Sequence, residues 1–190
     1  MAVFAVAIAS ASAANTLTLY ANGQPVPAGE SPGANPFKLE STSPVQITVP
    51  SKGISISCPP VYEKRALLGG YLKVNSRTFD KLRILDQGGF YETYRCGGVN
   101  IAGPGMLGVL ELRANGSGAL IGSRHGIGLV VDACIFWAKR LRVGATIGGP
   151  LAVSFAGTLT SEEAGCGNAT IETGWFQASF ESQPVEGLVE

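Results

Sequence analysis

Residues 151–160 read Leu-Ala-Val-Ser-Phe-Ala-Gly-Thr-Leu-Thr, which is the clearest secondary-structure signal in the chain. Leu151, Val153, Phe155 and Leu159 alternate with small or polar residues. Successive side chains of a β-strand point to opposite faces, whereas a helix repeats about every 3.6 residues. The stretch therefore predicts a strand that buries one face in a core.

The same period of two recurs along the chain. Ile54, Ile56 and Cys58 share one face of a predicted strand, which places the Cys58 sulfur on the core side. No long window has a helical period with caps, and residues 62–68 predict at most one helical turn. Further alternating stretches are residues 16–20, 45–49, 110–112 and 176–180.

Turn residues separate the predicted strands. Asn22-Gly23, residues 86–89 and Asn115-Gly116 are the main signals. Asn-Gly favours a type I′ turn because both residues tolerate positive φ, so residues 110–113 and 119–121 are expected to form a hairpin. Many short strands with Gly turns predict an all-β fold, either an antiparallel β-barrel or a β-sandwich, and periodicity does not separate the two.

Length and composition indicate one domain. The chain has 190 residues, of which 45% are hydrophobic, enough for one sizeable core. Charged residues make up only 15%, below the roughly 25% of an average soluble domain, which suits an extracellular β protein. We expect a single β domain over residues 15–182, with residues 21–36 as a surface connection and 183–190 as a flexible tail.

The first residues are typical of export. Residues 1–14, MAVFAVAIASASAA, are apolar and end in small residues of the A-x-A kind, which predicts a secretory signal. No Lys or Arg precedes the apolar run, so the signal is truncated or atypical; the alternative is a buried strand or helix. No segment is apolar for the about 20 residues that a membrane-spanning helix needs. The expected location is secreted or associated with the cell envelope.

Charge argues against a nucleic-acid partner. Lys plus Arg and Asp plus Glu number 14 each, so no strong field attracts an anionic polymer. The basic run at residues 139–142 fits an exposed strand face, with Arg140 and Arg142 on the side of Ala138, and Leu141 and Val143 on the other.

Four cysteines, an even number, predict two disulfides in an exported chain. Four cysteines allow three pairings. A weak similarity between the two halves of the chain favours the pairs Cys58–Cys96 and Cys134–Cys166. In each half an apolar strand that begins with Gly leads to the first Cys, and the second Cys lies beside Gly. The other two pairings stay open.

The cysteine spacing is unlike that of a metal site. A zinc site uses close pairs such as C-x₂-C with partnering histidines, whereas these cysteines lie far apart and the chain has 1 His. A catalytic thiol needs a nearby base, and nothing in the sequence places His125 beside a cysteine. We therefore predict no metal and no cofactor.

The pattern resembles a diffuse group of secreted, β-rich hypothetical proteins from actinobacteria. The resemblance covers residues 15–182 and rests on residues 53–58, residues 70–72, Cys96, residues 134–137, and Cys166 followed by residues 174–176. The group has no assigned activity, so the resemblance implies export and fold class and assigns no site residue.

Candidates for catalysis each have a plainer interpretation. His125 next to Ser123 suggests a general base, but no G-x-S-x-G elbow is present, which favours a turn residue. An acid/base pair for glycoside hydrolysis needs two carboxylates held together, and no spacing here enforces that. Asp132, inside the apolar run 129–134, either points outward or is a buried acid with a raised pKa. The other carboxylates considered are Asp80, Asp86, Glu92 and Glu111.

Aromatic residues are the candidate ligand contacts. Tyr91, Tyr94, Trp137 and Trp175 suit a sugar or lipid platform, although aromatic side chains also fill cores. Trp137 is the one expected to be exposed, since it shares a strand face with Lys139.

Three classes of function remain. The favoured one is a non-catalytic binding module for an extracellular small molecule, glycan or cell-surface partner, which predicts an apolar pocket or an exposed aromatic patch. The second is a structural envelope-associated protein without a pocket. The third, a secreted hydrolase, predicts at least two titratable groups converging in a cleft.

Overall fold

The computed structural model describes residues 16–29, 37–41, 43–59, 67–76, 79–86, 94–105, 108–122 and 126–189. Within these ranges the chain is all-β, and the only helical element is the short 3-10 turn η1 (Pro50–Lys52). No helix in this part of the chain has the length and apolar character to cross a membrane. The predicted leader, residues 1–14, and most of the weak helical turn at residues 62–68 lie outside the described residues.

In the part of the chain that the structure describes, nineteen strands join in one large antiparallel sheet. They are β1 (Leu17–Ala21), β2 (Gln24–Pro25), β3 (Phe37–Ser41), β4 (Val45–Val49), β5 (Ile54–Cys58), β6 (Leu67–Ser76), β7 (Phe79–Asp86), β8 (Tyr94–Cys96), β9 (Val99–Gly105), β10 (Gly108–Arg113), β11 (Ser117–Gly122), β12 (Ile127–Val131), β13 (Cys134–Ala138), β14 (Arg140–Ala145), β15 (Gly149–Pro150), β16 (Ala152–Thr160), β17 (Asn168–Thr173), β18 (Phe176–Phe180) and β19 (Gln183–Val189).

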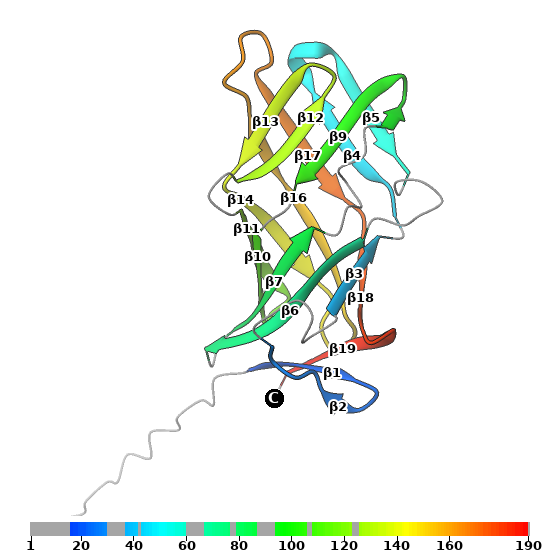
Figure 1. Cartoon of the computed structure of the whole chain (residues 1–190), viewed down its shortest axis with the longest axis vertical. Coiled ribbons are helices and arrows are strands. Elements are labelled where there is room, and N and C mark those ends of the chain that lie inside the picture. Colours follow the sequence, from blue (N-terminus) through cyan, green and yellow to red (C-terminus); the bar gives the residue numbers. More distant parts are fainter. Residues whose placement is uncertain are drawn as a thin grey trace, which may run out of the picture.

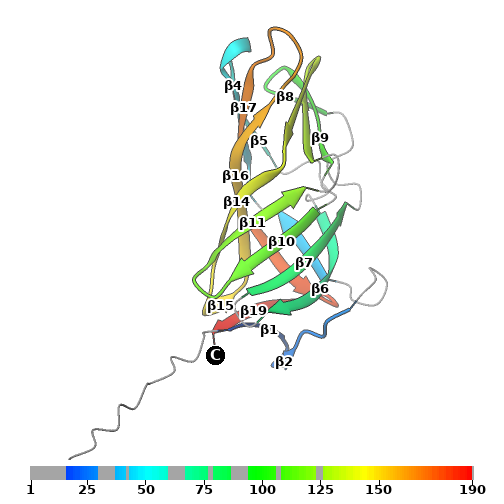
Figure 2. The same ribbon diagram turned by 90° about the vertical axis from the view of Figure 1, so that its left-hand side faces the viewer.

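The molecule is elongated, and β16 runs along its long axis (Figures 1 and 2). One edge of β16 pairs with β14 and then, through Thr160, with β13. The other edge pairs with β18 and then with β17. One residue, Lys139, separates β13 from β14, and two residues, Gly174 and Trp175, separate β17 from β18. Each pair therefore forms one long, interrupted strand beside β16.

The sheet curls back on itself around the core. At the end near β19, pairings pass in turn through β16, β18, β3, β6, β7, β10, β11 and β14 and return to β16. At the other end, β17, β4 and β5 form one edge, and β13, β12, β9 and β8 form the other. The sheet as a whole does not close into a barrel, because no described pairing joins β5 to β8.

The two disulfides connect segments that no backbone pairing in the described residues joins. Cys58 and Cys96 are bonded, which ties the end of β5 to the end of β8. Cys134 and Cys166 are bonded, which ties β13 to the connection between β16 and β17. The favoured pairing is thus confirmed. Across the β5–β8 seam Ile56 packs closely on Gly97, since a Cβ there would approach Ile56 Cγ2 to 2.8 Å.

The core consists of the inward residues of the alternating strands. Phe155 of β16 and Phe176 of β18 are almost fully buried and meet edge to face, with ring centroids 5.2 Å apart. This geometry suits the charge distribution of aromatic rings. The other largest buried side chains are Phe37, Phe136, Leu17, Leu19, Leu39 and Ile47.

Of the predicted turns, the one at residues 86–89 lies mostly outside the described residues. The predicted β10–β11 hairpin is confirmed, with a hydrogen bond from the Gly116 N–H to the Arg113 carbonyl. Its turn is not type I′, because Gly116 has positive φ and Asn115 does not. Asn22 and Gly23 both have positive φ in the turn between β1 and β2, as a type I′ turn requires.

Two local expectations are wrong. Residues 183–189 are strand β19, which pairs with β1, β15 and β18, where a flexible tail was expected; burial of Val185 and Gly187 explains the order. Ala138 is buried, whereas Arg140 and Arg142 are exposed. The irregularity at Lys139 shifts the alternation, so Ala138 does not share their face.

Candidate functional site

Trp137 lies flat on the surface of the β12–β13 hairpin. Trp137 pairs with Gly128 of β12, and a Cβ on Gly128 would lie 2.7 Å from Cζ3 of the indole. The two bonded neighbours Cε3 and Cη2 are equidistant from that point at 3.1 Å, which places Gly128 beneath the ring face rather than at its edge. Glycine is thus required here because any side chain would displace the ring.

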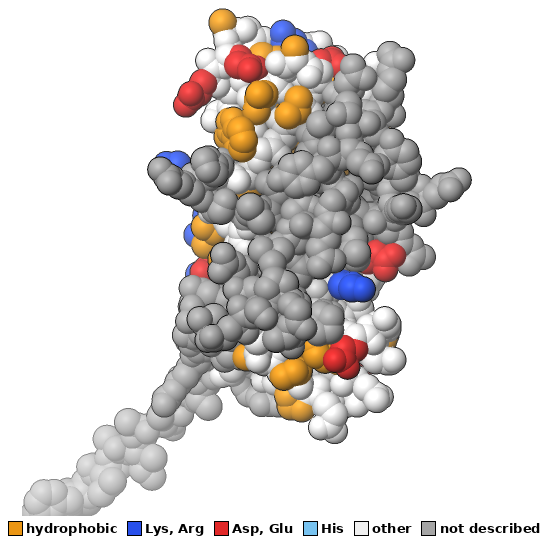
Figure 3. All heavy atoms as spheres, viewed as in Figure 1, with side chains coloured by type: hydrophobic (Ala, Val, Ile, Leu, Met, Phe, Trp, Pro, Cys, Tyr) orange, Lys and Arg blue, Asp and Glu red, His pale blue; other side chains and the backbone are white. Residues whose placement is uncertain are grey.

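The opposite face of the indole is open to solvent. Trp137 is 44% exposed and Ile135, two residues earlier on the same face of β13, is 38% exposed. Hydrophobic side chains gather over β12 and β13 in Figure 3. Thr160 of β16 is the other cross-strand neighbour of Trp137 and is exposed. We call Ile135, Trp137 and Thr160 the tryptophan platform.

The hairpin that carries this platform is held at its turn end. The Cys134–Cys166 disulfide fixes the first residue of β13 to the β16–β17 connection. Glu163 Oε2 in that connection accepts a hydrogen bond from the Ile135 N–H at 3.0 Å, which satisfies a backbone donor on the free edge of β13. Rigid support of this kind reduces the entropy lost when a ligand binds.

Three potential metal ligands lie close together at this disulfide, but they do not form a metal site. Cys134, Glu163 and Cys166 are the group of potential ligands that the described residues bring together. The two sulfurs are bonded to each other at 2.04 Å, so neither is available as a thiolate. The cluster is therefore a structural staple.

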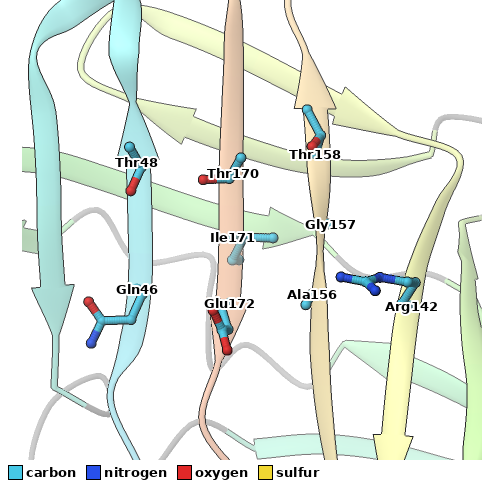
Figure 4. Close-up of a pocket in the computed structure, with 9 residues that line it drawn as sticks. All are labelled: Gln46, Thr48, Arg142, Ala156, Gly157, Thr158, Thr170, Ile171 and Glu172. Carbon is cyan, nitrogen blue, oxygen red and sulfur yellow. The ribbon is translucent and has the colours of Figure 1, made fainter.

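A second feature is a shallow hollow in the outer face of β14, β16, β17 and β4, with a volume of about 240 Å³ (Figure 4). The close-up shows the Arg142 guanidinium pointing from β14 toward Ala156. Two cross-strand rows line the hollow with polar groups: Thr48, Thr170 and Thr158 in one, and Gln46, Glu172, Ala156 and Arg142 in the other.

The hollow lies where the ladder between β14 and β16 lapses. Paired residues stop at Arg142 with Ala156 and resume at Trp137 with Thr160. Between these two pairs the β13–β14 segment advances by five residues, from Trp137 to Arg142, while β16 advances by four. One extra residue therefore forms a bulge near Lys139. Ala156 keeps the floor of the hollow low because its side chain is short. The side of Gly157 that lacks a side chain faces the core, where a Cβ would approach Leu141 Cδ2 to 2.7 Å.

Trp175, another predicted aromatic contact, does not join the tryptophan platform. It is 42% exposed, but it lies in the break between β17 and β18. Tyr94 is the first residue of β8, and its side chain, like the whole of Tyr91, lies outside what the structure describes.

The predicted acid–base candidates are likewise dispersed or not described. Asp132 is exposed, with a φ of 52° in the turn between β12 and β13, so the interpretation as a buried acid is wrong. Asp80 and Asp86 are separated by six positions on β7, about 20 Å along a strand. Glu111 is on β10, whereas His125 and Glu92 lie outside the described residues.

Sequence reasoning missed the hollow and the role of Gly128. The alternation of Asn168, Thr170 and Glu172 on exposed positions of β17 is the signal that marks the polar face. The hollow also depends on which strands pair with β17, and the alternation within a strand does not indicate its partners. Comparison of the chain with protein-family models, with curated proteins and with solved structures finds no match.

Proposed function

We propose that this chain is a non-catalytic binding module of the cell exterior, and that the tryptophan platform binds the apolar face of a neutral sugar residue. The observation that carries the proposal is the indole of Trp137, which lies flat over Gly128 with its other face exposed. A ring in this orientation needs no rearrangement before a flat ligand stacks on it.

A pyranose ring has the matching chemistry. The face of an indole carries partial negative charge, and the axial C–H groups of a sugar carry partial positive charge, so the two attract when stacked. The exposed hydroxyl of Thr160 lies beside the indole and is available to sugar hydroxyls. A free-standing aromatic patch with an adjacent hydroxyl suits a glycan better than a purely apolar ligand.

The carboxylates near the β12–β13 turn disfavour an acidic glycan at that end of the tryptophan platform. Asp132 follows β12, and Glu162 and Glu163 lie in the connection that the disulfide joins to β13. All three are exposed carboxylates at the same end of the molecule. Like charges repel, so an anionic polymer would be disfavoured there.

The disulfides support the proposed location. Structural disulfides persist in oxidising compartments and are rare in the cytosol. Both described bridges stabilise edges of the sheet, and residues 1–14 have the composition expected of a leader. Export would place a glycan-binding module at the cell surface or in the medium, where its ligand is found.

The test is retention on insoluble cellulose, chitin and xylan, followed by titration with soluble hexasaccharides of the retained polymer. We expect W137A to weaken binding at least tenfold. W175A is the matched control, because it removes an equally exposed tryptophan elsewhere and should leave binding unchanged. The chain has 2 Trp, so W175F leaves Trp137 as the sole indole, whose fluorescence should change on binding.

Two results would contradict the proposal. Equal binding by W137A and the wild type would show that the platform is not the site. Retention on none of the three neutral polymers would favour the alternative of an envelope-associated structural protein without a glycan ligand. Circular dichroism of each variant checks that the β-sheet is intact.

A further inference from the structure

The polar hollow on the outer face of β14, β16, β17 and β4 has a composition distinct from the tryptophan platform. Its walls carry three threonine hydroxyls, the amide of Gln46, one guanidinium and one carboxylate. Gln46 is itself held in place, because its Nε2 donates to Ser57 Oγ at 2.8 Å. The site is therefore rich in hydrogen-bonding groups, although Ile171 and Ala156 add apolar surface to its floor.

Arg142 is the group that defines the ligand. Its side chain points over Ala156 in Figure 4, and among the described residues no ion pair to its guanidinium is found. The nearest carboxylates in its cross-strand row are Glu172 on one side and Glu111 on the other. Each is two strands away, about 10 Å by the spacing of β-strands.

The strand irregularity adds positive charge beside Arg142. Lys139 and Arg140 are both exposed, whereas strict alternation would have turned one of them inward. Three cations thus lie on this segment against the single carboxylate in the hollow, Glu172. The chain as a whole has a formal net charge of +0, so the positive charge is local.

We propose that the hollow binds a carboxylate-bearing sugar residue, a uronate, of an acidic polysaccharide. The planar guanidinium of Arg142 matches a carboxylate with two parallel hydrogen bonds. Thr48, Thr158 and Thr170 bind the ring hydroxyls, and Glu172 accepts from a hydroxyl at the far side. This binding is independent of the tryptophan platform and goes beyond the function proposed above.

Size and charge select this ligand over others. A volume of about 240 Å³ is below the roughly 300–1,000 Å³ of pockets for drug-sized molecules, so it suits one sugar residue of a chain that continues over the open surface. A phosphate would bring close to two negative charges beside Glu172, whereas a uronate brings one, so repulsion by the Glu172 carboxylate is weaker for the uronate.

The experiment measures binding of short oligomers of galacturonate, glucuronate and mannuronate by calorimetry at low salt. The best ligand is compared with its methyl ester, which removes the charge and keeps the ring. We expect esterification to weaken binding at least tenfold, and R142Q to have an effect of similar size. R113Q, an exposed Arg→Gln change at the end of β10, is the matched control and should bind like the wild type.

Further variants separate the two sites. E172Q keeps an acceptor and removes the negative charge, so it should bind the acidic oligomer several-fold more tightly. W137A should bind it unchanged. Equal binding of acid and ester, full binding by R142Q, or loss of binding in W137A alone would overturn the assignment, as would absence of binding to all three oligomers. None of these results bears on neutral glycans at the platform.

Discussion

The hydroxyl of Thr173 accepts a hydrogen bond from the backbone N–H of Phe155 at 2.8 Å. The ladder between β16 and its neighbours pairs Ala156 with Glu172 but then Val153 with Phe176. Between these two pairs the β17–β18 segment advances by four residues while β16 advances by three, and this mismatch interrupts the backbone pairing at Phe155. The buried side chain of Thr173 supplies the acceptor that the interrupted ladder does not.

Replacement of this hydroxyl should therefore destabilise the fold. T173V keeps the shape of the side chain and leaves the Phe155 N–H without its acceptor in the core, at a cost of about 1–3 kcal/mol. Urea unfolding of T173V against wild type measures the loss. T173S, which keeps the hydroxyl, should lose less; an equal loss in both variants would attribute the effect to packing.

The two disulfides should have separable local effects. In the chain-entropy model, each closed loop of 38 or 32 residues contributes about 4 kcal/mol. C58A/C96A should increase hydrogen exchange in β5 and β8, because the disulfide is what joins those strands. C134A/C166A should increase it in β13 and weaken glycan binding at Trp137. Identical exchange patterns in both variants would contradict this division.

Close approach of three strands explains Gly118 on β11. A Cβ there would clash with the Glu111 carbonyl oxygen, a backbone atom, and would lie 3.3 Å from Val143 Cβ. G118A should therefore destabilise the protein by about 1–3 kcal/mol, the usual cost of overpacking. In G149A, where nothing lies within 4 Å, the change should stay within about 0.5 kcal/mol. Thermal unfolding of the pair makes the comparison, and equal melting temperatures would refute it.

The turn between β12 and β13 depends on the conformation of Asp132. Its φ of 52° is in the left-handed region, which Asp tolerates and β-branched residues do not. D132V should be about 1–2 kcal/mol less stable than D132G, because both lack the carboxylate but only glycine adopts this conformation without a steric cost. The check is calorimetric unfolding; a stable D132V would mean that the turn rearranges at little cost.

Alternation in the sequence was sufficient for the fold class and for many strands. Residues 151–160 became β16, and the Asn115-Gly116 signal became the β10–β11 turn, because both depend on neighbouring residues in the chain. The disulfide pairing also followed, from the similarity between the two halves of the chain. The exposed position of Trp137 was predictable, since alternation with buried Phe136 and Ala138 turns it outward.

Only the tertiary structure placed residues from distant strands together. Gly128 lies beneath Trp137, and Arg142 faces Glu172 across Ala156, because of strand order and register, which periodicity does not encode. Single-residue irregularities near Lys139 and Gly174 shift the facing of side chains, and the balance of packing around the whole sheet selects where they occur. Local patterns therefore specify strands, whereas the surfaces that meet a ligand arise from how those strands are paired.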